Sequence, residues 1–225
     1  MTFYTAPTPA TPEPAAPKRT SVIANPVFKL FAYLIAWFVF SASFTLFVEA
    51  ISTVQGSCAS GNTPYVIARP CSADVLDFIP WVIFTALIAV GIAVVFANGI
   101  GFQLRVWAWP LTFGILGAGF IGAGGGVGWG IGALFIVMAL VPLVIELRAS
   151  IQRVFLGSFN IFGQQFKESP KAQPSFSSRK MPNPPDAVKP KLGDWAVALL
   201  GFVIPLLAGY YVALLWVSAL HASQG

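Results

Sequence analysis

The sequence predicts an all-α membrane protein with five transmembrane helices, one glycine-rich helical hairpin, an N-terminus inside the cell and a C-terminus outside. Its composition supports this fold class, because 56% of the 225 residues are hydrophobic and only 9% are charged, whereas soluble domains carry about 25% charged residues. The central stretch 106–145 contains no Lys, Arg, His, Asp or Glu. Nearly all basic residues fall in segments that alternating spans place on one side of the membrane.

The first 25 residues form a proline-rich cytoplasmic tail that we expect to be disordered. They include five prolines and only three charged residues, and they offer too little apolar surface to offset the entropy of ordering. A membrane region of four spans is then predicted over residues 26–147, with its first span over Val27–Val48. This apolar run is longer than the h-region of a signal peptide, which has about 7–15 residues, so we expect an uncleaved span.

The outer loop, residues 50–77, holds both cysteines of the chain, Cys58 and Cys71. Twelve residues separate them, and the Gly, Asn and Pro among these favour turns. In an oxidising compartment this arrangement predicts a disulfide-closed loop, stabilised by about 2–4 kcal/mol. A metal site needs three or four ligands, and the single histidine, His221, lies far away near the C-terminus.

The stretch 106–145 is too long for one transmembrane helix, so it predicts a tight helical hairpin. As a single helix it would extend about 60 Å, whereas the hydrocarbon core of a bilayer is only half as thick. The turn is expected in the glycine cluster at residues 122–128, where glycine accepts positive φ. The arms are expected over Val106–Ile121 and Trp129–Ile145, after a second span over Phe78–Ala97. Because both arms are near the lower length limit for spanning, a re-entrant hairpin is an alternative.

Residues 148–194 are predicted to form a basic cytoplasmic linker, rich in Pro and Ser, with no apolar periodicity from which to build a core. Residues 146–156, which overlap the start of this linker, are expected to continue the fourth span as a helix along the membrane surface. The fifth span covers Trp195–Leu220 and is the main part of the C-terminal unit 195–225, which ends in a short outer tail.

The distribution of Lys and Arg sets the expected orientation. Twelve of the thirteen basic residues fall on the inner side of the five-span arrangement, and only Arg69 falls outside. This asymmetry follows the positive-inside rule. It also argues against nucleic-acid binding despite the net charge of +5, because the basic residues are spread over loops between apolar spans. The inner residues are Lys18, Arg19, Lys29, Arg105, Arg148, Arg153, Lys167, Lys171, Arg179, Lys180, Lys189 and Lys191.

Small residues recur at four-residue spacing through the hairpin and predict faces for close helix packing. Such faces let two helix backbones approach each other, either within one chain or between subunits. Packing between the two arms is the first interpretation, with the closest approach expected at Gly122 and Gly126; packing against another subunit is the alternative. The residues concerned are Gly114, Ala118, Gly122, Gly126, Gly128 and Gly132.

The chain offers little for enzyme chemistry. Gly117-Ala-Gly-Phe-Ile-Gly122 matches G-x-G-x-x-G, but it lies in an apolar span, whereas the dinucleotide motif needs a preceding strand and an acidic residue about 20 positions further on. No ionisable residue falls in the middle of a predicted span, where membrane catalysis normally leaves one. We therefore expect no enzyme, with no catalytic, cofactor-binding or metal-ligating residues.

The outer loop carries a resemblance to a known group of proteins. Cys-Ala-Ser-Gly-x-x-Pro-Tyr-x-Ile-x-x-Pro-Cys, residues 58–71, resembles a motif in small integral membrane proteins of actinobacteria. The size, the span count and the Pro-rich tails also resemble an accessory subunit of the cytochrome bcc–aa3 respiratory supercomplex. This resemblance implies a multi-pass protein of the bacterial plasma membrane that has no catalytic residues and contacts bcc and aa3 subunits of the electron transport chain.

Two functions of different classes are compatible with these features. The first is a non-catalytic accessory or scaffold subunit that binds larger integral membrane proteins, and lipids, through its small-residue faces, outer loop and tails. The second is a small homo-oligomeric transporter or channel-like protein whose glycine hairpins line a path. The chain shows none of the paired inverted repeats found in many transporters, which favours the first function.

We predict an intramolecular disulfide between Cys58 and Cys71, because both lie in the one sizeable outer loop. Alkylation of freshly isolated membranes without reductant should label neither thiol, and prior reduction should expose both, as peptide mass spectrometry would measure. Labelling of both thiols without reductant would contradict the bridge. Its loss should loosen the loop but leave the spans inserted.

Overall fold

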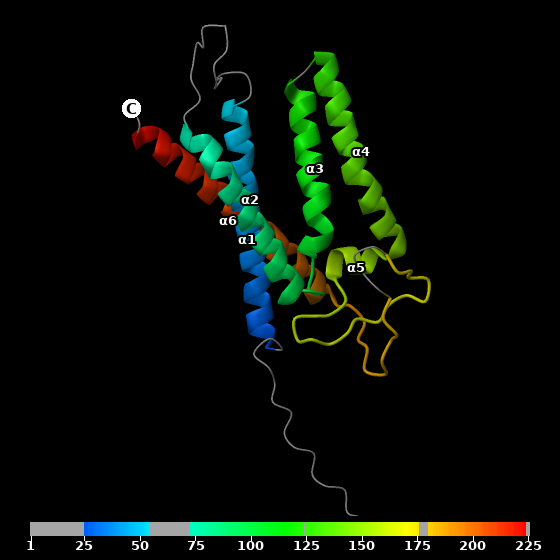
Figure 1. Ribbon diagram of the computed structural model, residues 1–225. Helices are drawn as coiled ribbons and strands as arrows, with labels where there is room; N and C mark the ends of the chain where they lie inside the picture. The colour runs from blue at the N-terminus through cyan, green and yellow to red at the C-terminus, as the bar shows by residue number, and fades with distance from the viewer. Residues whose placement is uncertain (1–24, 55–72, 124, 176–179, 224–225) are drawn as a thin grey trace, which may run out of the picture.

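The computed structural model describes residues 25–54, 73–123, 125–175 and 180–223, and within these ranges the protein is helical without a β-strand (Figure 1). Two isolated β-bridges, Phe159 with Gln165 and Phe166 with Val188, are the only ladder contacts in the described part. The helices are α1 (Pro26–Val54), α2 (Ala73–Val95), α3 (Leu104–Ala123), α4 (Gly125–Ala149), α5 (Ile151–Leu156) and α6 (Leu192–Ser223).

Four of these helices are long and apolar enough to cross a membrane, which confirms an all-helical, multi-pass membrane protein. The candidate spans lie in α1, α3, α4 and α6, while the apolar part of α2 is shorter, Pro80–Val95. The hairpin arms extend further than the sequence suggested, because α3 continues to Ala123 and α4 begins at Gly125 with φ +75°. At 20 and 25 residues, both arms reach the length needed to span.

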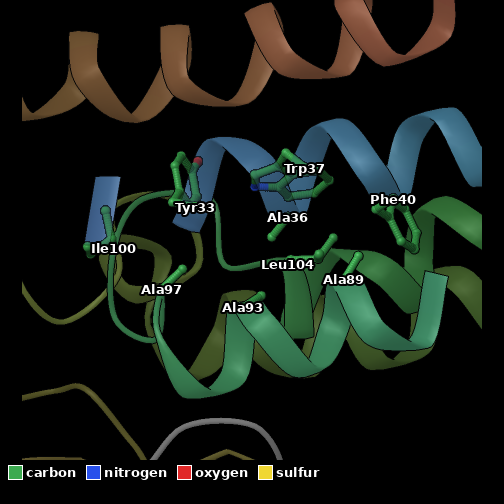
Figure 2. Close-up of a cluster of buried hydrophobic side chains, with 9 residues drawn as sticks. All are labelled: Tyr33, Ala36, Trp37, Phe40, Ala89, Ala93, Ala97, Ile100 and Leu104. Carbon is green, nitrogen blue, oxygen red and sulfur yellow. The ribbon is translucent and has the colours of Figure 1, made fainter. Parts of the chain in front are cut away.

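The core of the membrane region is the contact between α1 and α2 (Figure 2). One face of α1 presents large side chains, among them Trp37, which is fully buried. Alanines four residues apart on α2, and just beyond its end, lie opposite and are small enough to let the helix approach the rings. The Trp37 indole N–H donates to the Phe102 carbonyl oxygen at 3.0 Å, so its polar atom is satisfied. The cluster comprises Tyr33, Ala36, Trp37, Phe40, Ala89, Ala93, Ala97, Ile100 and Leu104.

The closest approach of two membrane helices outside the hairpin occurs where α6 crosses α1. A Cβ placed on Gly209 would lie 2.5 Å from the Phe38 carbonyl oxygen, so only glycine fits there. Nearby, the Ser41 hydroxyl donates to the Leu206 carbonyl oxygen at 2.7 Å. The α6 face toward α1 consists of buried small residues and one proline, namely Ala198, Gly201, Pro205, Gly209 and Ala213.

The α3–α4 hairpin stands beside the α1, α2 and α6 group and touches it only near the start of α3 (Figure 1). Leu104 belongs to the buried core, and Trp107, Ala108 and Leu111 pack against it. Beyond these first turns α3 packs on α4, and α4 packs on α3 and, at its end, on α5. Only 17% of the most apolar stretch of α4 is buried, against 39% for α1, so α4 is the most peripheral of the candidate spans.

The structure differs from the expectation of a linker without a core. Residues 150–175 and 180–191 form a folded unit, which we call the cap. The Ser150 hydroxyl accepts from the Arg153 N–H and caps α5, which separates α5 from α4 instead of continuing it. Phe166 is buried with Leu156 and Ala198 in a second small core. Beyond the short helix α5, the described part of the cap is built from turns and single backbone contacts, so its sequence shows no periodicity of a long helix or strand.

The cap joins the membrane region through backbone contacts that require glycine. Gly101 N–H donates to the Leu156 carbonyl oxygen, and Phe159 N–H donates to the Gly99 carbonyl oxygen, each at 2.9 Å. Gly157 has φ +74°, and a Cβ on it would lie 2.2 Å from the Gly99 oxygen. These contacts place the cap against the loop between α2 and α3, at the end of the molecule where α1 begins (Figure 1).

We predict that Gly157→Ala destabilises the protein far more than Gly163→Ala, a matched control. Both glycines have positive φ, but a Cβ on Gly163 would meet nothing within 4 Å. Left-handed backbone alone should cost Gly163→Ala about 1–2 kcal/mol, whereas the added clash should cost Gly157→Ala about 3 kcal/mol or more. Denaturant unfolding in detergent, followed by tryptophan fluorescence, measures the difference. Equal losses in the two variants would show that the backbone contact is unimportant.

Candidate functional site

The inner face of the hairpin is closed by glycines that bring the two arms into backbone contact. A Cβ on Gly132 would lie 2.6 Å from Ile121 Cγ1 and 2.8 Å from the Gly117 carbonyl oxygen. Toward the turn, a Cβ on Gly128 would lie 2.8 Å from the Phe120 carbonyl oxygen. At the other end, the Trp109 indole N–H crosses to the Met138 carbonyl oxygen at 3.0 Å. The arms are therefore antiparallel and tightly packed along most of α3.

The structure divides the predicted packing residues into two groups. Gly128 and Gly132 face the opposite arm, and a Cβ on Gly114 would be in ordinary contact with Ala139 Cβ at 4.0 Å. The expectation of closest approach at Gly122 and Gly126 is wrong, because a Cβ on either would meet no described atom within 4 Å. The prediction assumed that residues four apart, from Gly114 to Gly122, share one face. A helix completes a turn in 3.6 residues, so Gly117 faces inward and Ala118 does not.

The outward small residues gather on one side of the hairpin and form a surface that we call the outer small-residue face. A helix turns by about 100° per residue, so Ala118 and Gly122 of α3 are rotated about 100–140° from Gly117. On α4, Gly126, Gly130 and Ala133 are rotated in the same sense from Gly132, by about 100–160°. In an antiparallel pair these equal offsets point to the same side. All the members are exposed in the structure: Ala118, Gly122, Gly126, Gly130 and Ala133.

The opposite side of α3 faces the α1 and α2 pair across an apolar groove of about 330 Å³. Trp109 and Thr112 line this groove, and they are rotated from Gly117 in the other direction by about 80–140°. The groove walls also include Phe44 of α1 and Leu87 of α2. The outer small-residue face therefore points away from the rest of the chain.

A second concavity, of about 310 Å³, lies at the end of the molecule where the cap meets α1 and α6, and we call it the cap cleft. Its walls are mainly apolar, with Leu156, Phe159 and Phe166 from the cap and Ala198 from α6. Its polar lining residues are Tyr33, Asn160, Lys191 and Asp194. The sequence pointed to no site at these four residues, and named Lys191 only as one of the inner basic residues, because they lie on α1, in the cap and at the start of α6, which are distant in sequence.

The cap is held together by a buried ion pair. Arg153 Nε lies 3.4 Å from Glu168 Oε1, and their side chains are only 1% and 2% exposed. A second guanidinium nitrogen of Arg153 donates to the Gln173 carbonyl oxygen. Loss of one partner of such a buried pair typically costs about 3–5 kcal/mol, so the pair fixes the cap rather than serving as a reactive group.

Other predicted residues cannot be placed in a site. Cys58 and Cys71 lie outside the described residues, so the disulfide stays a prediction. Within residues 25–54, 73–123, 125–175 and 180–223, no group of three or more His, Cys, Asp or Glu side chains is arranged to hold a metal ion.

Comparison of the chain with models of known protein families, with curated proteins and with solved structures finds no match in any of the three.

We predict that Gly132→Leu disrupts the hairpin while Gly130→Leu does not. The two positions are two residues apart on α4, but Gly132 meets the facing arm and Gly130 has open space within 4 Å. Overpacking at Gly132 should lower the free energy of unfolding by about 1–3 kcal/mol or more. Thermal unfolding of both variants in mild detergent measures the effect. Equal tolerance of leucine at the two positions would refute the inner contact.

Proposed function

We propose that this chain is a five-span membrane protein that acts as a non-catalytic accessory or scaffold subunit of a larger membrane complex. The N-terminus and the cap lie inside the cell, and the C-terminus lies outside. The single observation that carries the proposal is the outer small-residue face, which no other described segment of the chain covers.

The arrangement of α2 supports the count of five spans. The ring of Phe28, near the start of α1, lies 5.5 Å from the ring of Phe96, just after α2 ends. Toward the other end, Phe47 of α1 and Val82 of α2 line the same groove. Helix α2 thus runs antiparallel to α1 and returns the chain to the end where α3 begins. The apolar part of α2, Pro80–Val95, would extend about 24 Å, and we propose that it crosses the membrane together with the neighbouring turns of the 23-residue helix.

The outer small-residue face suits a partner helix better than lipid. In a bilayer, helices associate through close van der Waals packing, and exposed glycine and alanine let a second backbone approach. The inner face of the same hairpin shows this chemistry at work within the chain, where Gly132 and Gly117 bring the arms into contact. A partner helix seated over Gly122 and Gly126 would use the same kind of packing.

The proposed partner is based on the resemblance in the outer loop. Residues 58–71 resemble small actinobacterial membrane proteins, and we propose a place beside the cytochrome subunits of a bcc–aa3 supercomplex in the bacterial plasma membrane. The subunit would contribute to assembly and stability, so its deletion should reduce the amount of intact complex more than the turnover of each complex.

We predict that reporters at the two ends of the chain lie on opposite sides of the membrane. An N-terminal fusion should report the inside and a C-terminal fusion the outside, in assays with a reporter that is active in only one compartment. A third fusion in the cap at Gly163, an exposed position, should agree with the N-terminal one. Finding both termini on one side would rule out five spans.

We predict that the tagged protein co-purifies with cytochromes at fixed stoichiometry in mild detergent. The double variant Gly122→Leu, Gly126→Leu should lower partner recovery by at least about fivefold, because bulky side chains keep the partner backbone away. Gly91→Leu is the matched control, since Gly91 is an exposed helical glycine with open space on α2.

Recovery of no cytochrome would overturn the proposed setting. A homo-oligomer in place of a complex would favour the transporter or channel-like function, particularly if liposomes containing only this protein showed a substrate flux. Equal losses in the Gly91→Leu control would show that the outer small-residue face is not the docking surface.

A further inference from the structure

We propose that the cap cleft binds a zwitterionic, amine-bearing phospholipid, with the headgroup at Lys191 and Asp194 and the ester region near the Tyr33 hydroxyl. The inference does not depend on the proposed function or on which side of the membrane the cap lies. It depends on the depth profile of the cleft, on the pair of opposite charges at its mouth and on a buried hydroxyl that makes no hydrogen bond of normal geometry within the described chain.

The cleft changes from polar to apolar in the direction that leads into the membrane. Lys191 and Asp194 lie at the start of α6, where the candidate span Leu192–Ala219 begins. Ala198, on the cleft wall, lies four residues after Asp194, or about 6 Å further along the helix. The cap contributes Phe159 and Phe166 as apolar walls. This profile matches an amphiphile at the boundary between water and hydrocarbon. The volume of the cleft lies in the range of small-molecule sites.

The charges at the mouth select the headgroup. The Asp194 carboxylate accepts the Lys191 backbone N–H through Oδ2 at 2.7 Å, which leaves its other oxygen for a ligand. Lys191 is exposed, and its ammonium has no ion-pair partner among the described residues. A phosphate is favoured by this ammonium and by the start of α6, and an amine is favoured by the carboxylate. A headgroup with negative charge alone would be repelled by Asp194.

The Tyr33 hydroxyl provides an independent indication of a ligand. Tyr33 is only 2% exposed, and its oxygen, although it lies near Trp37 and Phe102, makes no hydrogen bond of normal distance and angle within the described chain. The hydroxyl lies against Gly101, where a Cβ would come within 3.0 Å of it and within 3.3 Å of Ala198 Cα. Both neighbours line the cleft, so the hydroxyl points to its floor. Buried polar groups are normally paired, and an ester carbonyl of a lipid would accept this hydrogen bond.

The groove between α3 and the α1 and α2 pair has no charged residues in its lining that would select a ligand. Its lining is almost entirely apolar, and its few polar groups include the hydroxyls of Ser43 and Thr112, so nothing there selects one occupant. The cap cleft is distinguished by charge complementarity at a defined depth.

The test uses the full-length protein, purified in mild detergent and mixed with phosphatidylethanolamine, with phosphatidylglycerol or with free phosphoethanolamine. Native mass spectrometry measures how much of each compound stays bound. We expect phosphatidylethanolamine to exceed phosphatidylglycerol by at least about threefold, and free phosphoethanolamine, which lacks acyl chains, to bind far more weakly. Asp194→Asn should bring the ratio of the two lipids close to one.

Two further variants test the remaining contacts. Lys191→Gln should weaken retention of both lipids, whereas Lys189→Gln, a matched exposed lysine outside the cleft lining, should change neither. Tyr33→Phe keeps the ring packing and should lower retention of phosphatidylethanolamine by about fivefold, the size expected for one hydrogen bond.

The proposal is overturned if the two lipids bind equally to the unaltered protein, or if Asp194→Asn leaves their ratio unchanged. It is also overturned if Lys189→Gln matches Lys191→Gln, since retention would then reflect general surface charge. Equal binding of free phosphoethanolamine would exclude a lipid as the ligand. Unchanged retention in Tyr33→Phe would exclude the floor of the cleft from the site.

Discussion

Close contact between helix backbones across small residues sets the arrangement of the membrane helices in this protein. In lipid, apolar side chains gain little by leaving their surroundings, so helices associate where their surfaces fit closely. At Gly209 the backbones of α6 and α1 approach so closely that a Cβ would lie 2.5 Å from a carbonyl oxygen. Within the hairpin, a Cβ on Gly132 would lie 2.8 Å from the Gly117 carbonyl oxygen. Large side chains such as Trp37 are accommodated opposite alanines of α2. The positions of glycine and alanine thus determine which helices become neighbours.

The hairpin shows how the same residue types serve two purposes. Gly117 and Gly132 close the two arms, while Gly122 and Gly126, only a few residues away, face outward. Because α4 packs almost entirely on α3, its remaining surface is available to lipid or to another protein. A hairpin that is rigid within itself and attached to the core through the start of α3 presents its outer small-residue face as a fixed surface, and a partner helix would lose little entropy in ordering it.

At the cap end, the constraint changes from packing in lipid to satisfaction of polar groups. Arg153 and Glu168 are buried together, and the loops around them bond to one another through backbone groups. Gly99, Gly101 and Gly157 make this possible, because a side chain at any of them would meet a neighbour too closely. The cap cleft results from this arrangement, since the cap covers the ends of α1 and α6 without filling the space between them. The proposed lipid would occupy that space and pair the Tyr33 hydroxyl.

Amino-acid composition and hydrophobic patterning alone predict the class of protein, the positions of the apolar helices and the glycine turn of the hairpin. These features depend on local composition and on the length of apolar runs, which a single chain displays directly. The packing of the folded chain was needed to tell which small residues face inward, because Gly117 and Ala118 differ by a rotation of about 100° that a four-residue pattern does not resolve. The same is true of the cap and its cleft. Tyr33, Phe159 and Asp194 are brought together by the backbone contacts at Gly99, Gly101 and Gly157, and residues so far apart in sequence carry no periodic signal of their proximity.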